Sequence, residues 1–262
     1  MAYKTSPFAS LNSWIKRLIE AIFLGGQAIF HIFRLKIHWR NTMEQMAMAG
    51  PESLGIALLT AGFVGMVFTI QVAREFINFG VPEVVGGVLA LALARELAPV
   101  LTAVVLAGRV GSAFAAEIGT MRVTEQIDAL YVLKTDPIDY LVVPRLLACC
   151  IMLPILTILS LITGMLGGLL VASAIYNLSY AEFLDSARNF LQVWDLFSAM
   201  LKAVVFGSLV AIIGCSWGLT TTGGAKGVGQ STTTAVVTAL LAIFTANFFL
   251  SWVIFQGTVS SA

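Results

Sequence analysis

Arg95 and Glu96 form a charged pair inside a long apolar stretch of the chain. Charges at membrane depth cost on the order of 3 kcal/mol each on insertion scales, so they face protein or water there. Pro99 lies four residues after Arg95 and has no N–H to donate to the Arg95 carbonyl, which predicts a bend in the helix. A charged pair at such a bend indicates a transport pathway, and a pair that only braces neighbouring helices is the alternative.

A second chemically distinct stretch, residues 108–133, has the sequence GRVGSAFAAEIGTMRVTEQIDALYVL. Apolar segments long enough to span a bilayer flank it, whereas its middle carries the charged residues Glu117, Arg122, Glu125 and Asp128. Apolar residues recur at helical spacing from Val123 to Tyr131, which predicts a short amphipathic helix over about 117–133. Such a helix between two spans docks onto a protein outside the membrane, or it is simply a solvated loop helix.

Signatures of an enzyme are weak in this sequence. The only histidines, His31 and His38, lie near the N-terminus, so no histidine-rich metal site can form in the apolar spans, and we expect no metal site. Residues 223–232, GGAKGVGQST, are glycine-rich, but Lys226 is not followed by Ser or Thr as a P-loop requires. We therefore expect no catalytic residues, and any directional work must draw on a gradient or on a partner.

The composition places the chain among polytopic membrane proteins. Of its 262 residues, 58% are apolar and only 11% are charged, whereas about a quarter of the residues of a soluble domain are charged. The mean hydropathy is +0.92. A net charge of +1 gives no signal for a polyanionic partner, so we expect no binding to nucleic acid.

The predicted fold class is an all-α membrane protein. Residues 1–50 combine basic residues with regularly spaced aromatic ones, which predicts an interfacial amphipathic helix; a disordered basic tail is the alternative. Residues 51–262 are predicted to form one five-span domain with spans at about 54–73, 84–107, 146–175, 196–219 and 235–255. A flexible Gly- and Thr-rich connection is expected between the last two spans.

The distribution of basic residues predicts the orientation. With the N-terminus in the cytoplasm, eleven of the fifteen Lys and Arg residues fall on the inner side, and Arg74, Arg188 and Lys202 fall on the outer side. This asymmetry favours a cytoplasmic N-terminus and places residues 108–145 in the cytoplasm.

Residues 92–130, ALARELAPVLTAVVLAGRVGSAFAAEIGTMRVTEQIDAL, resemble the signature region of MlaE-family permeases. These are the membrane subunits of ABC-type lipid transporters that work with MCE-domain proteins. The resemblance extends from the N-terminal helix through all five spans. Two mild departures are Ala98, where Gly is common, and Val123, where Ala is common.

The resemblance implies roles for particular residues. The helix matching residues 117–133 would be the coupling helix on a cytoplasmic ATPase, with Glu117, Arg122, Glu125 and Asp128 as contacts. A lipid cavity would form between two copies of the chain, lined by spans one, two and five. The cavity residues expected here are Arg95, Glu96, Val67, Ile70, Gln71, Phe76, Leu97 and Val100.

The implied function is a non-enzymatic permease that moves phospholipid or a related lipid between the inner membrane and an MCE-domain partner. ATP and magnesium would bind in a separate ATPase subunit, so no cofactor is expected in this chain. The implied location is the inner (plasma) membrane of a double-membraned bacterium or a plastid inner envelope, with the N-terminus cytoplasmic or stromal. A gradient-driven transporter with Arg95 and Glu96 as an ion site is the main alternative. A lipid-modifying enzyme is disfavoured because no nucleophile–base set is visible.

Overall fold

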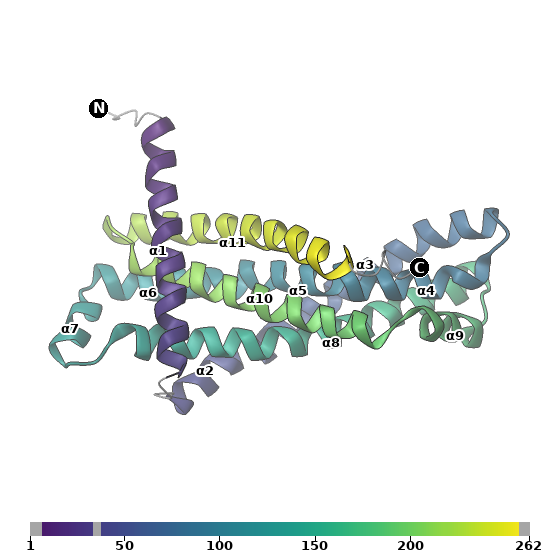
Figure 1. Cartoon of the computed structure of the whole chain (residues 1–262), viewed down its shortest axis with the longest axis horizontal. Helices are drawn as coiled ribbons and strands as arrows, with labels where there is room; N and C mark the ends of the chain where they lie inside the picture. The colour runs from purple at the N-terminus through teal and green to yellow at the C-terminus, as the bar shows by residue number, and fades with distance from the viewer. Residues whose placement is uncertain (1–6, 34–37, 257–262) are drawn as a thin grey trace. The chain divides into compact units, whose positions relative to one another are not determined.

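The computed structural model describes residues 7–33 and 38–256, with side chains for residues 14–32 and 38–256, and nearly all of these residues are helical (Figure 1). The α-helices are α1 (Pro7–Phe33), α2 (Trp39–Ala49), α3 (Pro51–Asn78), α4 (Val85–Ala92), α5 (Ala98–Leu106), α6 (Ser112–Val123), α7 (Gln126–Val132), α8 (Val143–Tyr176), α9 (Tyr180–Phe190), α10 (Val193–Leu219) and α11 (Gly224–Phe255). Four short elements join them: the 3₁₀ turn η1 (Pro82–Val84) and the π-helical turns η2 (Leu93–Leu97), η3 (Ala107–Gly111) and η4 (Ile138–Val142). The all-α fold class is thus confirmed.

Five helical segments of the described chain are long and apolar enough to cross a membrane, as the sequence predicts. They are Trp39–Asn78, Pro82–Val123, Ile138–Tyr176, Val193–Leu219 and Gly224–Phe255. Each extends beyond the predicted apolar stretch, because a helix continues through polar residues once their backbone groups are bonded within it. Parts of the predicted N-terminal region, residues 1–6 and 34–37, lie outside the described residues.

The expected flexible connection before the last span is wrong for most of its length. The non-helical connection is confined to residues 220–223, and α11 begins at Gly224. Gly223 and Gly224 have positive φ angles of +88° and +65°. The threonines that follow are held within the helix, since Thr232 and Thr234 each donate a hydroxyl hydrogen bond to the carbonyl four residues earlier. This local bonding makes a polar Thr-rich stretch compatible with the first turns of a long helix.

The chain divides into two compact units. Unit 1 comprises residues 1–46, 107–149 and 208–242, and unit 2 comprises residues 47–106, 150–207 and 243–262. The helices α8, α10 and α11 each contribute residues to both units.

In unit 2, glycines allow α3 and α8 to pack closely. A Cβ atom added to Gly65 would meet the Gly164 carbonyl, and one added to Gly167 would meet the Gly62 carbonyl. These glycines therefore let the two helices approach closely, whereas Gly55 faces open space. Beside this contact lies an apolar core of Ala73, Val85, Leu89, Leu93, Ala172 and Phe183.

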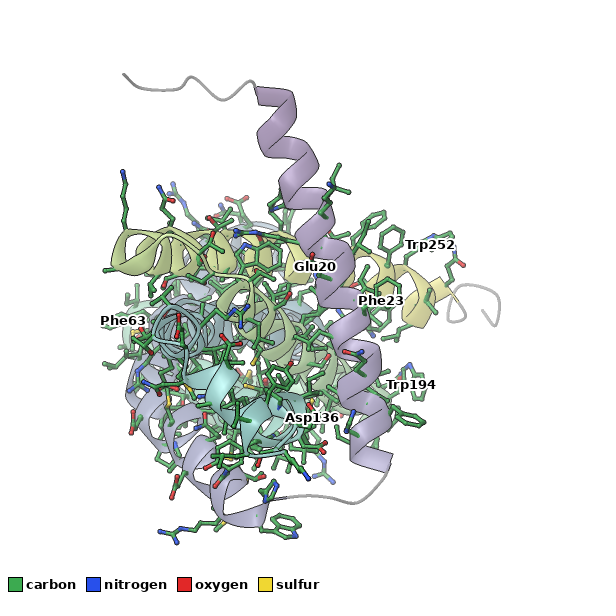
Figure 2. All side chains as sticks on the ribbon, turned by 90° about the vertical axis from the view of Figure 1, so that its left-hand side faces the viewer. Glu20, Phe23, Phe63, Asp136, Trp194 and Trp252 are labelled. Carbon is green, nitrogen blue, oxygen red and sulfur yellow. The ribbon has the colours of Figure 1, made fainter. Side chains whose placement is uncertain are left out.

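In unit 1, α1 crosses the long helices at a steep angle and contacts them along one face (Figure 1). Ala21, Leu24 and Ala28 are buried, and Gly25 lies against Ile212 of α10. The opposite face exposes large apolar side chains such as that of Phe23, which is labelled in Figure 2. An apolar outer face is typical of a helix that lies in a membrane interface, and α1 is amphipathic as predicted.

The stretch 117–133, expected as one helix, is divided between α6 and α7. The second span's helix continues to Val123, and Glu125 then adopts a left-handed conformation with φ of +60°. The N–H groups of Thr124 and Glu125 bond back to the carbonyls of Thr120 and Arg122, which closes α6. The chain therefore turns a corner here before α7 starts at Gln126.

Candidate functional site

Arg95 and Glu96 lie on the π-helical turn η2, between α4 and α5 of the second span. The Ala98 N–H bonds the Leu93 carbonyl five residues earlier instead of the usual four. Such π turns are rare and occur frequently at functional sites, because they place side chains outside the regular helical register. The bend predicted at Pro99 stays a prediction, whereas the irregularity that the structure shows is this π-helical turn, which begins at Leu93.

The Arg95 carbonyl, which Pro99 cannot bond, accepts a hydrogen bond from another helix. Lys202 of α10 donates from Nζ to this oxygen at 2.6 Å. A carbonyl without a donor inside a bilayer costs several kcal/mol, on the order of the penalty for any unsatisfied backbone group. Lys202 therefore compensates the hydrogen bond that the proline removes.

Glu96 is the centre of a hydrogen-bonded cluster formed by three spans. Its Oε1 accepts from Lys202 Nζ at 2.9 Å and from Ser251 Oγ at 2.7 Å, and its Oε2 accepts from Asn247 Nδ2 at 2.7 Å. Lys202 Nζ also donates to Ser251 Oγ at 2.8 Å. An ammonium group has three N–H donors, and Lys202 uses them on Arg95, Glu96 and Ser251.

Arg95 points to a second carboxylate. Its Nε donates to Asp195 Oδ1 at 2.7 Å, and Asp195 is 1% exposed. The other Asp195 oxygen accepts the Gln192 N–H at 3.0 Å, so the carboxylate is fixed from two sides. The guanidinium carbon lies 4.7 Å from the centre of the Phe255 ring, in a cation–π contact.

The Arg95 side chain stays partly accessible. The side chain is 38% exposed, and among the described residues only Asp195 hydrogen-bonds it, through Nε. The terminal nitrogens Nη1 and Nη2 are therefore available for a bidentate contact with an anion such as a phosphate. Two cations and two carboxylates make the cluster neutral overall, which lowers the cost of placing it at membrane depth.

The structure gives Lys202 a role that the count of basic residues does not predict. The basic-residue count assigns it to the outer side, whereas it lies in α10 with a fully buried side chain. Its charge is used inside the protein and carries no information about orientation. Sequence reasoning likewise missed Asp195, Asn247 and Ser251, although a charged or amide side chain within an apolar helix is the signal that identified Arg95 and Glu96.

The other residues expected at the cavity lie in unit 2 but not together. Val67, Ile70 and Gln71 are on the exposed face of α3, whereas Phe76 and Leu97 pack against the apolar core of the unit. Val100 is partly buried on α5. A groove of about 420 Å³ does run along α3, but nearer its N-terminus, where Gly62 and Phe63 face Leu166 of α8.

The four charged residues expected at the ATPase occupy different positions around the corner of α6 and α7. Glu117 lies within α6 and pairs with Arg145 Nη2 of α8 at 2.7 Å. Arg122 and Asp128 join across the corner at 2.8 Å, with both side chains substantially exposed. Glu125 occupies the corner itself and is exposed.

The end of α7 is the most apolar exposed part of this corner. Ile127 is buried and anchors α7, whereas Tyr131, Val132 and Leu133 are 62%, 83% and 72% exposed. Three consecutive exposed apolar residues at the end of a short helix are typical of a docking surface. We refer to Tyr131, Val132 and Leu133 as the apolar tip.

Comparisons with known proteins agree with this architecture. The family model described as Permease MlaE matches residues 42–253. A probable ABC transporter permease of Synechocystis is 68% identical over 97% of this chain and 96% of its own length. The chloroplastic protein TRIGALACTOSYLDIACYLGLYCEROL 1 of Arabidopsis thaliana is 52% identical, over 97% of this chain and 73% of its own. A probable ABC transporter permease of Pyropia yezoensis is 47% identical, over 96% of this chain and 95% of its own length.

Proposed function

The chain belongs to the MlaE permease family, and from this premise we propose that it moves a phospholipid or related lipid through the membrane as the permease subunit of an ABC transporter. ATP hydrolysis takes place in a separate cytoplasmic ATPase. The lipid passes between the inner membrane and an MCE-domain partner on the outer side. The name of the Arabidopsis relative is that of a galactolipid, which supports a lipid as the cargo.

The single observation that carries the lipid proposal is the partly exposed Arg95 side chain, which is held through Nε alone. A phospholipid has a charged head and apolar tails, so its site needs one cation at a defined depth among apolar walls. Asp195 holds the guanidinium by Nε, and Nη1 and Nη2 remain available. This geometry suits bidentate recognition of a phosphate oxygen pair.

Glu96 and Lys202 act as the support of this site in the proposal. Their hydrogen bonds join η2 to α10 and α11, so a movement of either helix moves the turn that carries Arg95. The cluster thereby couples a change in helix packing to the position of the head-group site. A chain that only scaffolds a complex would need no such linked charges.

The proposed cavity lies between two copies of the chain, with α3 and α11 facing it. Of the five candidate spans, those ending at Asn78 and Phe255 are the least buried within the chain. Unburied apolar faces such as those of Phe63 and Trp252 (Figure 2) need lipid or a second copy to cover them. A homodimer that encloses lipid would cover these apolar faces.

The apolar tip and the charged residues around it form the proposed ATPase-docking surface. The Arg122–Asp128 pair fixes α7 against α6, and Glu125 presents a carboxylate beside the tip. The pair of Glu117 with Arg145 connects α6 to the base of α8, so pressure on α7 reaches two spans. This surface is placed on the cytoplasmic or stromal side, with the N-terminus.

The proposed location is the inner membrane of a double-membraned bacterium or a plastid inner envelope. Relatives from a cyanobacterium and from a chloroplast support this choice.

Lipid transfer by the reconstituted transporter tests the role of Arg95. The chain is combined with its ATPase and MCE partners in proteoliposomes, and transfer of a fluorescent phospholipid is followed after ATP addition. We expect Arg95→Gln to reduce transfer at least about tenfold, since one bidentate contact to an anion is worth on the order of 1.5–3 kcal/mol. Arg95→Lys keeps the charge without the fork, and we expect it to retain part of the activity.

Two controls separate loss of recognition from loss of fold. Arg74→Gln removes an exposed arginine at the end of α3 and should leave transfer unchanged. The double variant Arg95→Gln/Asp195→Asn avoids a buried unpaired carboxylate, so it should fold normally and still fail in transfer. Transfer within twofold of wild type in Arg95→Gln contradicts the proposed head-group site.

A further inference from the structure

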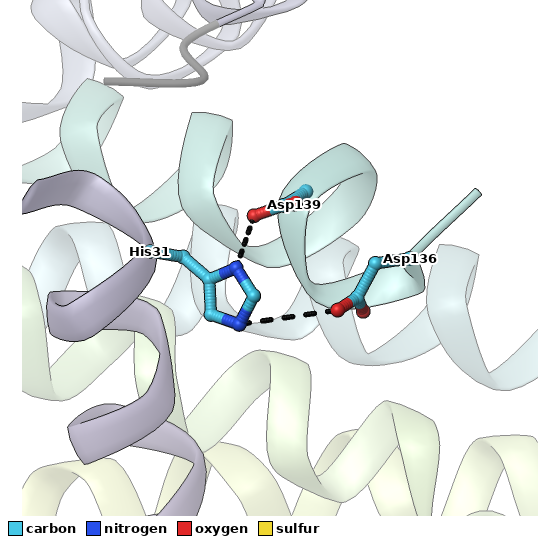
Figure 3. Close-up of side chains that lie close together, drawn as sticks. All are labelled: His31, Asp136 and Asp139. Atoms are coloured by element: carbon cyan, nitrogen blue, oxygen red, sulfur yellow. Dashed lines mark ion pairs between the residues drawn. The ribbon is translucent and has the colours of Figure 1, made fainter. Parts of the chain in front are cut away.

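His31, Asp136 and Asp139 gather at one point in unit 1, remote in sequence from the residues of the proposed transport site (Figure 3). His31 lies near the C-terminal end of α1, Asp136 lies in the turn that follows α7, and Asp139 lies on η4. The chain thus brings together one imidazole and two carboxylates from segments more than 100 residues apart. These are donor groups that divalent metal ions bind.

The distances between these groups differ on the two sides of the imidazole ring. Nδ1 of His31 lies 2.6 Å from Oδ1 of Asp139, and Nε2 lies 3.9 Å from Oδ2 of Asp136. One donor atom from each of the three side chains lies within 4.8 Å of the others. A separation of 3.9 Å is too long for a hydrogen bond, but two bonds of about 2.1 Å to a shared ion span up to about 4.2 Å.

Two observations indicate that the carboxylates lack a full set of partners. Oδ1 of Asp139 is buried and accepts no hydrogen bond of acceptable geometry from the described residues, despite its closeness to His31. Asp136 accepts the Ile138 N–H at 2.9 Å through Oδ1, which fixes the side chain and leaves Oδ2 facing the ring. The Asp139 oxygen therefore has the His31 ring as a near neighbour in an ion pair but without a well-aligned hydrogen bond. A metal ion bound between the two groups would satisfy the oxygen better.

We propose that His31, Asp136 and Asp139 bind one divalent transition-metal ion, with Zn²⁺ and Mn²⁺ as the best candidates. The imidazole favours Zn²⁺ over Ca²⁺ and Mg²⁺, which prefer ligands that are all oxygen, and the two carboxylates suit Mn²⁺. Small side-chain rotations bring one ring nitrogen and one oxygen of each carboxylate to bonding distance, and water completes the coordination. The sequence alone predicts no metal site, because neither spacing nor motif connects His31 with residues 136–139.

The bound ion would join α1 to the turn between α7 and η4. His31 and Asp139 are mostly buried, so the ion would be fixed to the protein on one side and reached by water from the side of Asp136, the more exposed ligand. The site would fasten the N-terminal helix to the segment that leads from α7 into α8. This inference does not depend on the transported substrate or on the ATPase.

Metal binding to the purified full chain tests the inference. The protein carries a tag without histidines, is stripped with a chelator in detergent, and is titrated with Zn²⁺ and Mn²⁺ in a calorimeter. We expect one ion per chain, and at least tenfold weaker binding in each of His31→Ala, Asp136→Asn and Asp139→Asn. His38→Ala is the matched control: the chain's other histidine contacts Tyr140 edge-on, is not part of the cluster, and its loss should leave binding unchanged.

A stability measurement gives an independent readout. An ion that binds only the folded chain raises the unfolding temperature, so Zn²⁺ should stabilise wild type and His38→Ala but not Asp136→Asn. Asp136 is the most exposed of the three ligands, and its amide variant is the one best able to fold if His31→Ala fails. Binding to wild type no tighter than to Asp136→Asn overturns the proposal, as does equal loss in His38→Ala. A further outcome is that the variants are less stable while wild type binds no metal. That result would show that the cluster is an ion pair only, and it would overturn the proposal as well.

Discussion

Replacing Lys202 by Met tests whether the membrane cluster is held together by its charge pair. Methionine has a similar length and no donor, so Glu96 loses its cation while keeping the hydrogen bonds from Ser251 and Asn247. The Arg95 carbonyl also loses the donor that replaces the missing N–H of Pro99. The change leaves one unpaired carboxylate and one unbonded carbonyl in the second span.

The expected cost follows from the burial of the two partners. Removing one member of a buried ion pair costs about 3–5 kcal/mol because the other charge stays uncompensated. Glu96 is 43% exposed whereas Lys202 is fully buried, so Lys202→Met should cost about 3 kcal/mol, near the lower end. Glu96→Gln leaves the fully buried ammonium unpaired and should cost at least as much.

A double-mutant cycle measured by SDS-induced unfolding in mixed micelles isolates the pair. The double variant Lys202→Met/Glu96→Gln removes both charges, so we expect it to be more stable than either single variant and the coupling to reach about 2–3 kcal/mol. Lys226→Met changes an exposed lysine in the first turn of α11 and should have no measurable effect. Single variants that each cost under about 1 kcal/mol and add independently would refute the importance of the pair.

Three further predictions concern packing and coupling. Gly65→Ala should destabilise the chain by about 1–3 kcal/mol in the same assay, because its Cβ would meet backbone of α8, whereas Gly55→Ala faces open space and should be neutral or stabilising. Glu125→Lys should reduce ATPase binding or stimulation in a pull-down and phosphate-release assay while the permease still folds; unchanged binding and hydrolysis would leave the corner a solvated loop. Val132→Asp should abolish co-purification of the ATPase, and Val81→Asp, a similar change at the exposed turn before η1, should not; retention of the ATPase by Val132→Asp would exclude the apolar tip from the interface.

The five spans could be predicted because each is a long apolar run, but their ends could not. Polar residues continue a helix when local hydrogen bonds satisfy them, as Thr232 and Thr234 do at the start of α11. The corner between α6 and α7, within residues 117–133, could not be predicted either. Helical spacing of apolar residues continues through it, whereas the left-handed conformation of Glu125 has no signature in a residue type that rarely adopts it.

The candidate site was predictable only in part. Arg95 and Glu96 stand out because charges are rare in apolar runs, but their partners come from residues about 100 and 150 positions away. Lys202 is a charged residue within an apolar span, as Arg95 is. Only the packing of the unit shows that Lys202 donates hydrogen bonds to Glu96 and to the Arg95 carbonyl, which Pro99 cannot bond. The apolar cavity residues are harder still, because an apolar helix in lipid gives no signal for the face that a substrate contacts.

The most direct test of the central claim is the energy source for lipid transfer. Proteoliposomes containing the chain and the proposed ATPase and MCE-domain partners are loaded with fluorescent phospholipid. Transfer is measured with ATP, with a non-hydrolysable ATP analogue, and with ATP plus an ionophore. An ABC permease of the kind proposed here transfers lipid only while ATP is hydrolysed and is unaffected by the ionophore. Transfer that continues without ATP and stops when the ionophore removes the gradient would contradict it and would make Arg95 and Glu96 the ion site of a gradient-driven transporter.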